Sequence, residues 1–107
     1  MTRHSTYQWL EAIRDSRCPQ CARRELIGGP WGGASRNLYC PRCMICWTAH
    51  GIRFGIAFVD CEGPITADQL HFARRRYGRQ PWRFGDEAPP RRWTMQAMLK
   101  QLMRGRP

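Results

Sequence analysis

The feature that most constrains the fold is a pair of short cysteine motifs at a fixed interval. A Cys-Pro-Gln-Cys motif at residues 18–21 and a Cys-Pro-Arg-Cys motif at 40–43 give the spacing C-x2-C-x18-C-x2-C. A two-residue gap lets both thiolates of one turn point at a single ion, and the long interval is a hairpin that brings the second turn alongside. Zinc prefers four such ligands in a tetrahedron. The spacing predicts a zinc site formed by Cys18, Cys21, Cys40 and Cys43.

The length of the chain explains why a metal is needed. The chain has 107 residues, and a domain of this size buries roughly 65% of the surface that its unfolded form exposes. Zinc binding contributes on the order of 10–16 kcal/mol of apparent folding free energy, which compensates for a small core. Four thiolates fill the coordination shell and leave no position for a catalytic water, so we expect the zinc to be structural.

Two further cysteines lie outside the pattern. Cys46 forms an overlapping C-x2-C with Cys43, and Cys61 follows a predicted strand. One interpretation places Cys46 in the coordination shell by a ligand swap. The other treats Cys46 and Cys61 as small buried apolar groups, a common environment for free cysteine.

Periodicity and turn residues predict a small, metal-stapled α+β fold: a zinc ribbon of three to four short antiparallel strands, with an N-terminal helix and two C-terminal helices. A S-x-x-Q capping box precedes the first helix, and a T-x-x-Q box at Thr66 precedes the second, which ends near Gly78. The glycine-rich residues 28–35 predict a loop, His50-Gly51 a hairpin turn, and 78–93 a connector. The expected helices are Thr6–Ser16, Thr66–Tyr77 and Thr94–Arg104, and the expected strands are Glu25–Ile27, Asn37–Tyr39, Met44–Thr48 and Ile52–Val59.

We expect three segments along the chain: an N-terminal helical arm at 1–17, the zinc ribbon at 18–61, and a basic helical extension at 62–107. Methionine and leucine fall on one stripe of the last expected helix. That stripe is either part of the core or a docking face for a partner, because methionine adapts to irregular surfaces.

The segment between the cysteine motifs resembles a known family. Residues 26–37 read Leu-Ile-Gly-Gly-Pro-Trp-Gly-Gly-Ala-Ser-Arg-Asn. They are similar to the hairpin G-P-x-G-G-x-S-x-N that small bacteriophage zinc-ribbon proteins carry between their knuckles. The resemblance covers about residues 18–58 and implies the ribbon fold and a phage context, not an activity. Such knuckles often have glycine after the second cysteine, where this chain has Ala22 and Met44. The matching positions are Gly29, Pro30, Gly32, Gly33, Ser35 and Asn37.

Charge is concentrated in one part of the chain. The net charge is +10, of which residues 1–69 carry +2 and residues 70–107 carry +8. Arginine provides 17 of the 18 basic side chains, and its planar fork suits phosphate and carboxylate groups. A GC-rich genome would also favour arginine. The asymmetry predicts a polyanionic partner for the C-terminal half.

The candidate contacts with nucleic acid or an acidic partner are basic residues interleaved with aromatic rings, a pattern that suits single strands. Trp82 is the stacking candidate, although tryptophans in a connector also serve as anchors to the core. The candidate residues are Arg74, Arg75, Arg76, Arg79, Trp82, Arg83, Arg91 and Arg92.

The glycine-rich hairpin offers a second contact. Clustered backbone amides form anion-binding nests, and Trp31 with Arg36 would then stack on and pair with a nucleotide. The alternative is a tight hairpin end with Trp31 folded back onto the sheet.

We expect a non-enzymatic, phage-type protein that binds nucleic acid through this Arg- and Trp-rich half, with a role in host takeover. Its histidines and serines lack the spacing of a hydrolase or nuclease centre, and no small-molecule substrate is evident. The alternative is a protein–protein interaction module that docks on a larger acidic partner, such as host RNA polymerase, a defence nuclease complex or a virion shell. Charged residues throughout residues 1–17 argue against a signal peptide, and no uncharged stretch is long enough for a membrane span. We expect an intracellular location in the cytoplasm of the bacterial host.

Overall fold

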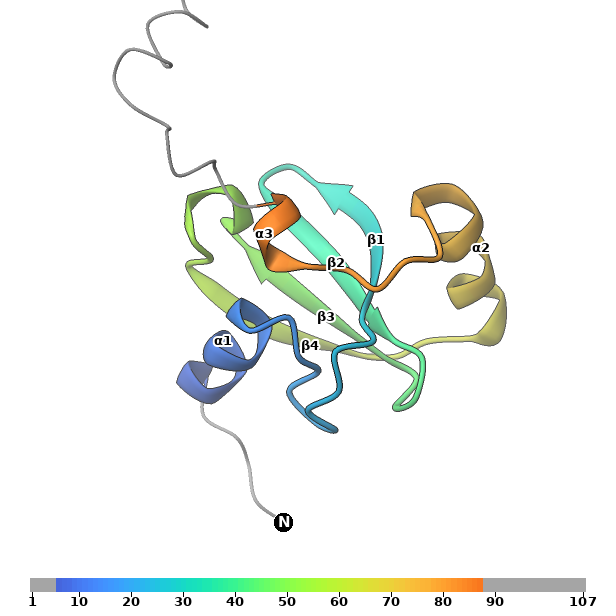
Figure 1. The fold of residues 1–107 in the computed structure, drawn as a ribbon, viewed down its shortest axis with the longest axis horizontal. Coiled ribbons are helices and arrows are strands. Elements are labelled where there is room, and N and C mark those ends of the chain that lie inside the picture. The colour runs from blue at the N-terminus through green and yellow to red at the C-terminus, as the bar shows by residue number, and fades with distance from the viewer. Residues whose placement is uncertain (1–5, 88–107) are drawn as a thin grey trace, which may run out of the picture.

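A four-stranded antiparallel sheet forms the centre of the molecule (Figure 1). The computed structural model describes residues 6–87, and these form a small α+β fold with three α-helices. The strands follow one another across the sheet in the order β1-β2-β3-β4. In chain order the elements are α1 (Thr6–Arg14), β1 (Ile27–Gly32), β2 (Ser35–Cys40), β3 (Ile45–His50), the 3-10 helix η1 (Ile52–Phe54), β4 (Phe58–Pro64), α2 (Ala67–Tyr77) and α3 (Phe84–Glu87).

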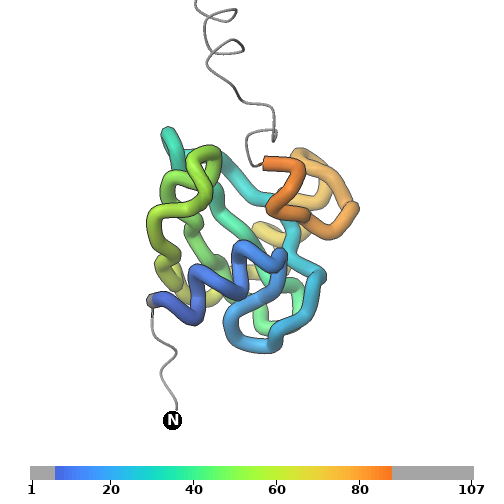
Figure 2. Tube along the Cα trace, turned by 60° about the vertical axis from the view of Figure 1, so that its left-hand side comes forward, coloured from blue at the N-terminus to red at the C-terminus, as the bar shows by residue number. Residues whose placement is uncertain are grey.

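Both faces of the sheet are covered, because side chains alternate between two hydrophobic clusters. Leu38, Trp47 and Val59 lie on one face and pack with Ile13 of α1 and with Trp82. The other face carries the second cluster, whose members are Ile27, Tyr39, Cys46, Ile65, Leu70 and Ala73. Figure 1 shows α1 beside β4 and α2 beside β1, and the turned view in Figure 2 shows these two helices on different sides of the molecule.

Local sequence signals placed α2 correctly. The Thr66 hydroxyl accepts a hydrogen bond from the Gln69 backbone N–H at 3.1 Å, and the Gln69 side chain accepts one from the Thr66 N–H at 2.7 Å. These two bonds satisfy free amides at the helix start. Gly78, with φ of 113°, ends the helix and donates its N–H to the Arg74 carbonyl. The predicted capping box and helix end are confirmed.

Two expectations about the strands were wrong. The glycine-rich segment is not a loop over its whole length, because Ile27–Gly32 pairs with β2 and the turn is confined to the positions after Gly32. The expected strand Ile52–Val59 begins only at Phe58. Gly51 and Gly55 adopt left-handed φ values of 66° and 93°, which fold the intervening residues into η1. The alternating apolar residues that predicted a strand here do not reveal turns formed by glycines with positive φ.

Several predictions fall outside the described residues. These are the capping role of Ser5, the final helix at 94–104 with its methionine stripe, and the contacts of Arg91 and Arg92. The combination of one N-terminal and two C-terminal helices is therefore not confirmed, and the division into three segments stays a prediction. No helix within residues 6–87 combines the length and the apolar character that crossing a membrane requires.

Candidate metal centre

The two cysteine motifs fold into equivalent turns at one end of the sheet. In the first, the Ala22 N–H donates to the Cys18 carbonyl at 2.8 Å, and in the second the Met44 N–H donates to the Cys40 carbonyl at 2.9 Å. Ala22 and Met44 both adopt a left-handed φ, of 63° and 54°. The residue after each second cysteine therefore reverses the chain, the task that glycine performs with the least steric cost.

The four thiols converge. The sulfur atoms of Cys18, Cys21, Cys40 and Cys43 all lie within 4.8 Å of one another. Cys18 Sγ is 3.9 Å from Cys43 Sγ, and Cys21 Sγ is 3.7 Å from Cys40 Sγ. A tetrahedral ion bonded to sulfur at about 2.3 Å would place its ligands about 3.8 Å apart. The cluster therefore has the dimensions of a closed four-sulfur metal site.

Electrostatics at the cluster require a cation if all four thiols are to ionise. The Cys40 thiol has its pKa lowered to about 5, first by a hydrogen bond from the Cys18 thiol and also by the Cys43 backbone N–H. The pKa of Cys18 is raised, first by its hydrogen bond to Cys40 and then by burial. Burial, together with hydrogen bonds to Cys21 and Cys40, raises the pKa of Cys43 to about 11. One thiolate thus suppresses ionisation of its neighbours, and a bound divalent cation would reverse that effect.

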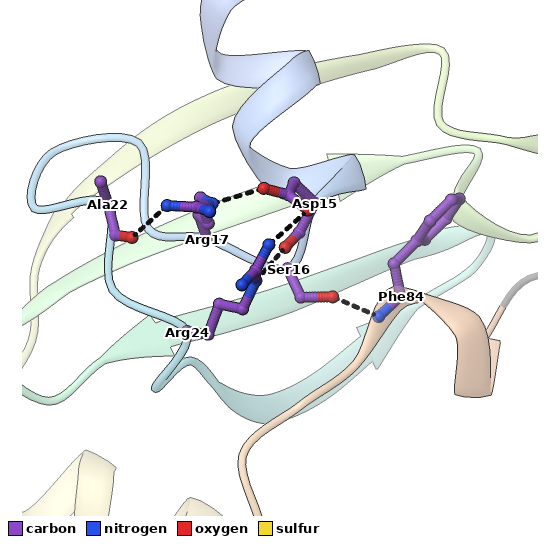
Figure 3. A network of polar contacts seen from close by, with 6 residues as sticks. All are labelled: Asp15, Ser16, Arg17, Ala22, Arg24 and Phe84. Carbon is purple, nitrogen blue, oxygen red and sulfur yellow. Dashed lines mark hydrogen bonds and ion pairs between the residues drawn. The ribbon is translucent and has the colours of Figure 1, made fainter.

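Polar contacts fix the first knuckle against α1 and the C-terminal segment (Figure 3). Asp15 accepts hydrogen bonds from Arg17 and, at 2.8 Å, from Arg24, and these bonds lower the pKa of Asp15, Arg24 having the larger effect. Arg17 also reaches the Ala22 carbonyl at 3.4 Å. The Phe84 N–H donates to Ser16 Oγ at 2.8 Å. The end of α1 therefore holds both the knuckle and the start of α3.

The second knuckle is tied to the first through a charged pair. Arg42 Nε donates to Glu25 Oε2 at 2.8 Å, and this hydrogen bond lowers the pKa of Glu25. Glu25 lies just before β1, so the pair joins the hairpin base to the turn that carries Cys40 and Cys43. Both side chains are about half exposed, so the pair orients the turn more than it stabilises the fold.

The remaining cysteines have different environments. Cys46 is buried, with 6% exposure, on the face of the sheet covered by α2, and it does not join the thiol cluster. Burial raises the pKa of Cys46 to about 11. Cys61 is exposed. The interpretation of a buried apolar group therefore fits Cys46 and does not fit Cys61.

Four of the predicted basic residues, Arg74, Arg75, Arg76 and Arg79, lie at the C-terminal end of α2, whereas Arg83 directly precedes α3. His71, Arg74, Arg75 and Arg79 line a shallow hollow of about 380 Å³. Within residues 6–87, the side chains of these three arginines form no hydrogen bond or ion pair. Positive charge in the last turn suits the negative end of the helix dipole. Nothing in the part of the chain that the structure describes occupies these guanidinium groups.

Arg36 is not available, contrary to the expectation of a contact at the hairpin tip. Its side chain is 9% exposed, donates to the Glu87 carboxylate at 2.7 Å and donates to the Gly29 carbonyl at 2.8 Å. A Cβ on Gly28 would lie 2.2 Å from the Arg36 guanidinium, so glycine at this position makes room for the buried arginine. Arg36 is buried because its ion-pair partner, Glu87, comes from a segment 51 residues later in the chain.

The two predicted stacking rings are also engaged within the fold. Trp31 has the guanidinium groups of Arg36 and Arg53 at 4.9 and 4.7 Å from its ring centroid, so it folds back as the hairpin alternative described. Trp82 is 5% exposed and packs in the core, where its backbone N–H donates to the Leu26 carbonyl at 2.6 Å. The expectation of a solvent-facing Trp82 does not fit this position. The anchor alternative does.

Sequence reasoning missed Phe72. Phe72 was not singled out among the candidate contacts, yet its side chain on α2 is 58% exposed. Arg75 and Arg76 follow it at i+3 and i+4, so the ring shares a helix face with two arginines. The angular separation of Phe72 from buried Leu70 and Ala73 was the available signal.

Comparisons with protein-family models, with curated proteins and with solved structures find no match to this chain.

Proposed function

We propose that the four clustered cysteines hold one zinc ion with a structural role. Support comes from the sulfur separations of 3.7 and 3.9 Å, which suit tetrahedral thiolate coordination. Zinc has no redox chemistry and no geometric preference beyond that tetrahedron, so it suits a closed staple. The two knuckle turns, with Cys18 and Cys40 buried, then form the base of a zinc ribbon of the kind that the phage-family resemblance implies.

Elemental analysis tests this assignment. We expect one zinc per chain in the wild type and in Cys61→Ser, because Cys61 is exposed and lies outside the cluster. Cys18→Ser should lose the metal. An equal zinc content in Cys18→Ser and wild type would contradict the proposal, as would iron in place of zinc.

We further propose that the outward face of α2 binds single-stranded nucleic acid. The observation that carries this proposal is a set of arginines with no partner within residues 6–87, Arg74, Arg75 and Arg79, on the helix that also carries the exposed ring of Phe72. Guanidinium groups bind phosphates, and an exposed aromatic ring stacks on a base in a way that tolerates sequence. Arg76 adds positive charge on the same helix, and Arg83, Arg91 and Arg92 follow in the chain.

Salt dependence is the most direct test. Binding of a labelled single-stranded oligonucleotide is measured by fluorescence anisotropy over a range of salt concentrations. We expect a steep decrease in affinity with salt, because neutralised phosphates release counterions. The triple variant Arg74→Gln, Arg75→Gln, Arg79→Gln should reduce the slope of log affinity against log salt by about 2, since each single-strand contact contributes roughly 0.7.

The matched control is the triple variant Arg17→Gln, Arg23→Gln, Arg42→Gln. It removes the same net charge, but from arginines that have acidic partners within the fold. Equal slopes for the two triple variants would mean that only net charge matters and would refute the assignment to α2. Retention of a stoichiometric protein partner from nuclease-treated lysate, together with salt-indifferent oligonucleotide binding, would favour the protein-docking alternative.

A further inference from the structure

A second group of metal-ligating side chains lies at the end of the sheet opposite the cysteines. His50 ends β3, and Asp60 and Glu62 lie on the neighbouring strand β4. One ligand atom from each of these three residues lies within 4.8 Å of the other two. Antiparallel pairing creates this proximity, because Thr48 is opposite Asp60 and His50 is opposite Phe58.

The spacing of the group fits a small divalent cation. His50 Nε2 lies 2.9 Å from Asp60 Oδ2. A cation that bonds nitrogen and oxygen at about 2.1 Å places adjacent octahedral ligands about 3.0 Å apart. This separation is that of a hydrogen bond, and it also equals that of two neighbouring ligands on one ion, so a cation could replace the shared proton with little movement of the two side chains. Glu62 would supply a third ligand.

Neighbouring side chains hold the candidate ligands in place. Ser35 Oγ is 2.8 Å from His50 Nδ1, and the Phe58 ring stacks on the imidazole with centroids 4.2 Å apart. Nε2 donates its proton to Asp60 Oδ2 in the structure, while Nδ1 faces Ser35 Oγ. A bound cation would replace the Nε2 proton, and Nδ1–H would then donate to Ser35, the orientation that metal-binding histidines normally have. The Thr48 hydroxyl lies 2.8 Å from Glu62 Oε1 and 2.9 Å from Asn37 Oδ1, so its single proton is shared between these two acceptors.

The negative charge of the Asp60 and Glu62 carboxylates also favours binding of a cation. Within the described part of the chain, Asp60 has His50 as its ion-pair partner, and no arginine or lysine pairs with either carboxylate. Asp60 thus has one imidazole as its partner, and Glu62 has no cationic partner within residues 6–87, in a protein whose net charge is +10. Beside them lies a hollow of about 500 Å³ whose lining includes Ser35, His50 and Glu62.

We propose that His50, Asp60 and Glu62 form a second metal site, for a divalent first-row transition cation such as Mn²⁺ or Zn²⁺. An imidazole with two carboxylates suits these ions better than Ca²⁺ or Mg²⁺, which take oxygen ligands. Three protein ligands leave coordination positions for water or for an oxygen ligand from the adjoining hollow. This site differs from the thiol cluster in its ligand chemistry and in its open coordination shell.

Manganese titration tests the site in the full-length protein with its cysteine cluster loaded with zinc. Mn²⁺ binds thiolates weakly, so Mn²⁺ binding measures occupancy of the nitrogen–oxygen site alone. The electron paramagnetic resonance signal of free Mn²⁺ disappears on binding. We expect one Mn²⁺ per wild-type chain, displaced by added Zn²⁺. His50→Ala and Glu62→Gln should abolish binding, and Ser35→Ala should weaken it by about tenfold to a hundredfold through loss of the outer hydrogen bond.

Asp68→Asn is the matched control, because it removes an exposed carboxylate on α2 that is outside the cluster. It should bind Mn²⁺ as the wild type does. Asp60→Asn, at a half-exposed position, serves if His50→Ala fails to fold. Absence of binding to the wild type, or equal binding by wild type, Glu62→Gln and Asp60→Asn, would overturn the proposal.

Discussion

Arginines of the knuckles and sheet differ from those of α2 in what surrounds them. Arg17, Arg24, Arg36 and Arg42 each bond to an acidic side chain, and Arg14 donates to the backbone carbonyls of residues 55 and 56. The arginines of α2 and its end make no such bond within residues 6–87. One residue type therefore serves two purposes: it joins segments in the first region, and in the second it has no hydrogen-bond or ion-pair partner among residues 6–87.

The difference shows why net charge alone is a weak guide to function. Arg36 is among the candidates that the sequence offered for contact with nucleic acid, yet it lies buried against Glu87. Its charge is balanced inside the protein. Only charges without an internal partner are expected to release counterions from a polyanion, so the paired and unpaired arginines should respond differently to substitution.

The largest expected effect comes from removing the proposed zinc ion, on which we expect both regions to depend. Cys40→Ser, or chelation of the wild type, should abolish the cooperative thermal transition, because zinc contributes on the order of 10–16 kcal/mol, as much as the whole stability of a typical domain. Circular dichroism during heating measures this loss. Cys61→Ser is the control and should melt as the wild type does. A chelated protein that still melts cooperatively would show that the core alone supports the fold.

The next largest loss of stability is expected from breaking the buried ion pair between Arg36 and Glu87. Arg36→Met leaves the Glu87 carboxylate, which is 17% exposed, without its partner and frees the Gly29 carbonyl. We expect a loss of about 2–3 kcal/mol in the free energy of unfolding, somewhat below the usual cost of an orphaned buried charge because Glu87 has access to water. Denaturant unfolding measures it. The salt slope of oligonucleotide binding should not change, and a reduced slope would place Arg36 with the unpaired arginines instead.

Substitution of Phe72 should have the opposite outcome to substitution of Arg36: it should weaken oligonucleotide binding and leave stability almost unchanged. Phe72→Ala removes an exposed ring, so stability should change little, while loss of one stacked base weakens oligonucleotide binding by about 1–2 kcal/mol, or roughly tenfold. The salt slope should stay the same because no charge is removed. Phe54→Ala is the control, since its side chain is 86% exposed but lies on η1. Equal losses of affinity in the two variants would show that the ring on α2 has no special role.

Local chemistry was predictable from the sequence, and contacts between distant segments were not. The spacing of Cys18 and Cys21 and the capping box at Thr66 are set by a few neighbouring residues, so pattern reading placed both correctly. The burial of Arg36 depends on Glu87, 51 residues later, and on the missing side chain of Gly28. No local pattern carries that information.

Strand register explains why the sequence did not predict the group formed by His50, Asp60 and Glu62. His50 meets Asp60 and Glu62 only when β3 and β4 pair in one register, which shifts at a bulge between Cys46 and Trp47. Gly63 is a local sign of that bulge, because glycine within a strand often marks one, but the expected strand Ile52–Val59 ended before both acidic residues. A candidate metal site made from two strands is therefore visible only once their pairing is known.

The smallest expected change in stability comes from glycine substitutions in the two cysteine turns, which can be compared with each other. Ala22 and Met44 have the same left-handed backbone, a conformation that costs a residue with a Cβ roughly 1–2 kcal/mol and costs glycine almost nothing. Ala22 is exposed, so Ala22→Gly should raise the free energy of unfolding by about 0.5–1 kcal/mol after the entropy of glycine in the unfolded chain is counted. Met44 packs against the cluster under α2. Met44→Gly therefore gains the same relief but loses that contact, and it should be destabilising. Denaturant unfolding of the zinc-loaded variants measures both, and destabilisation by Ala22→Gly would show that the first knuckle is not strained at this residue.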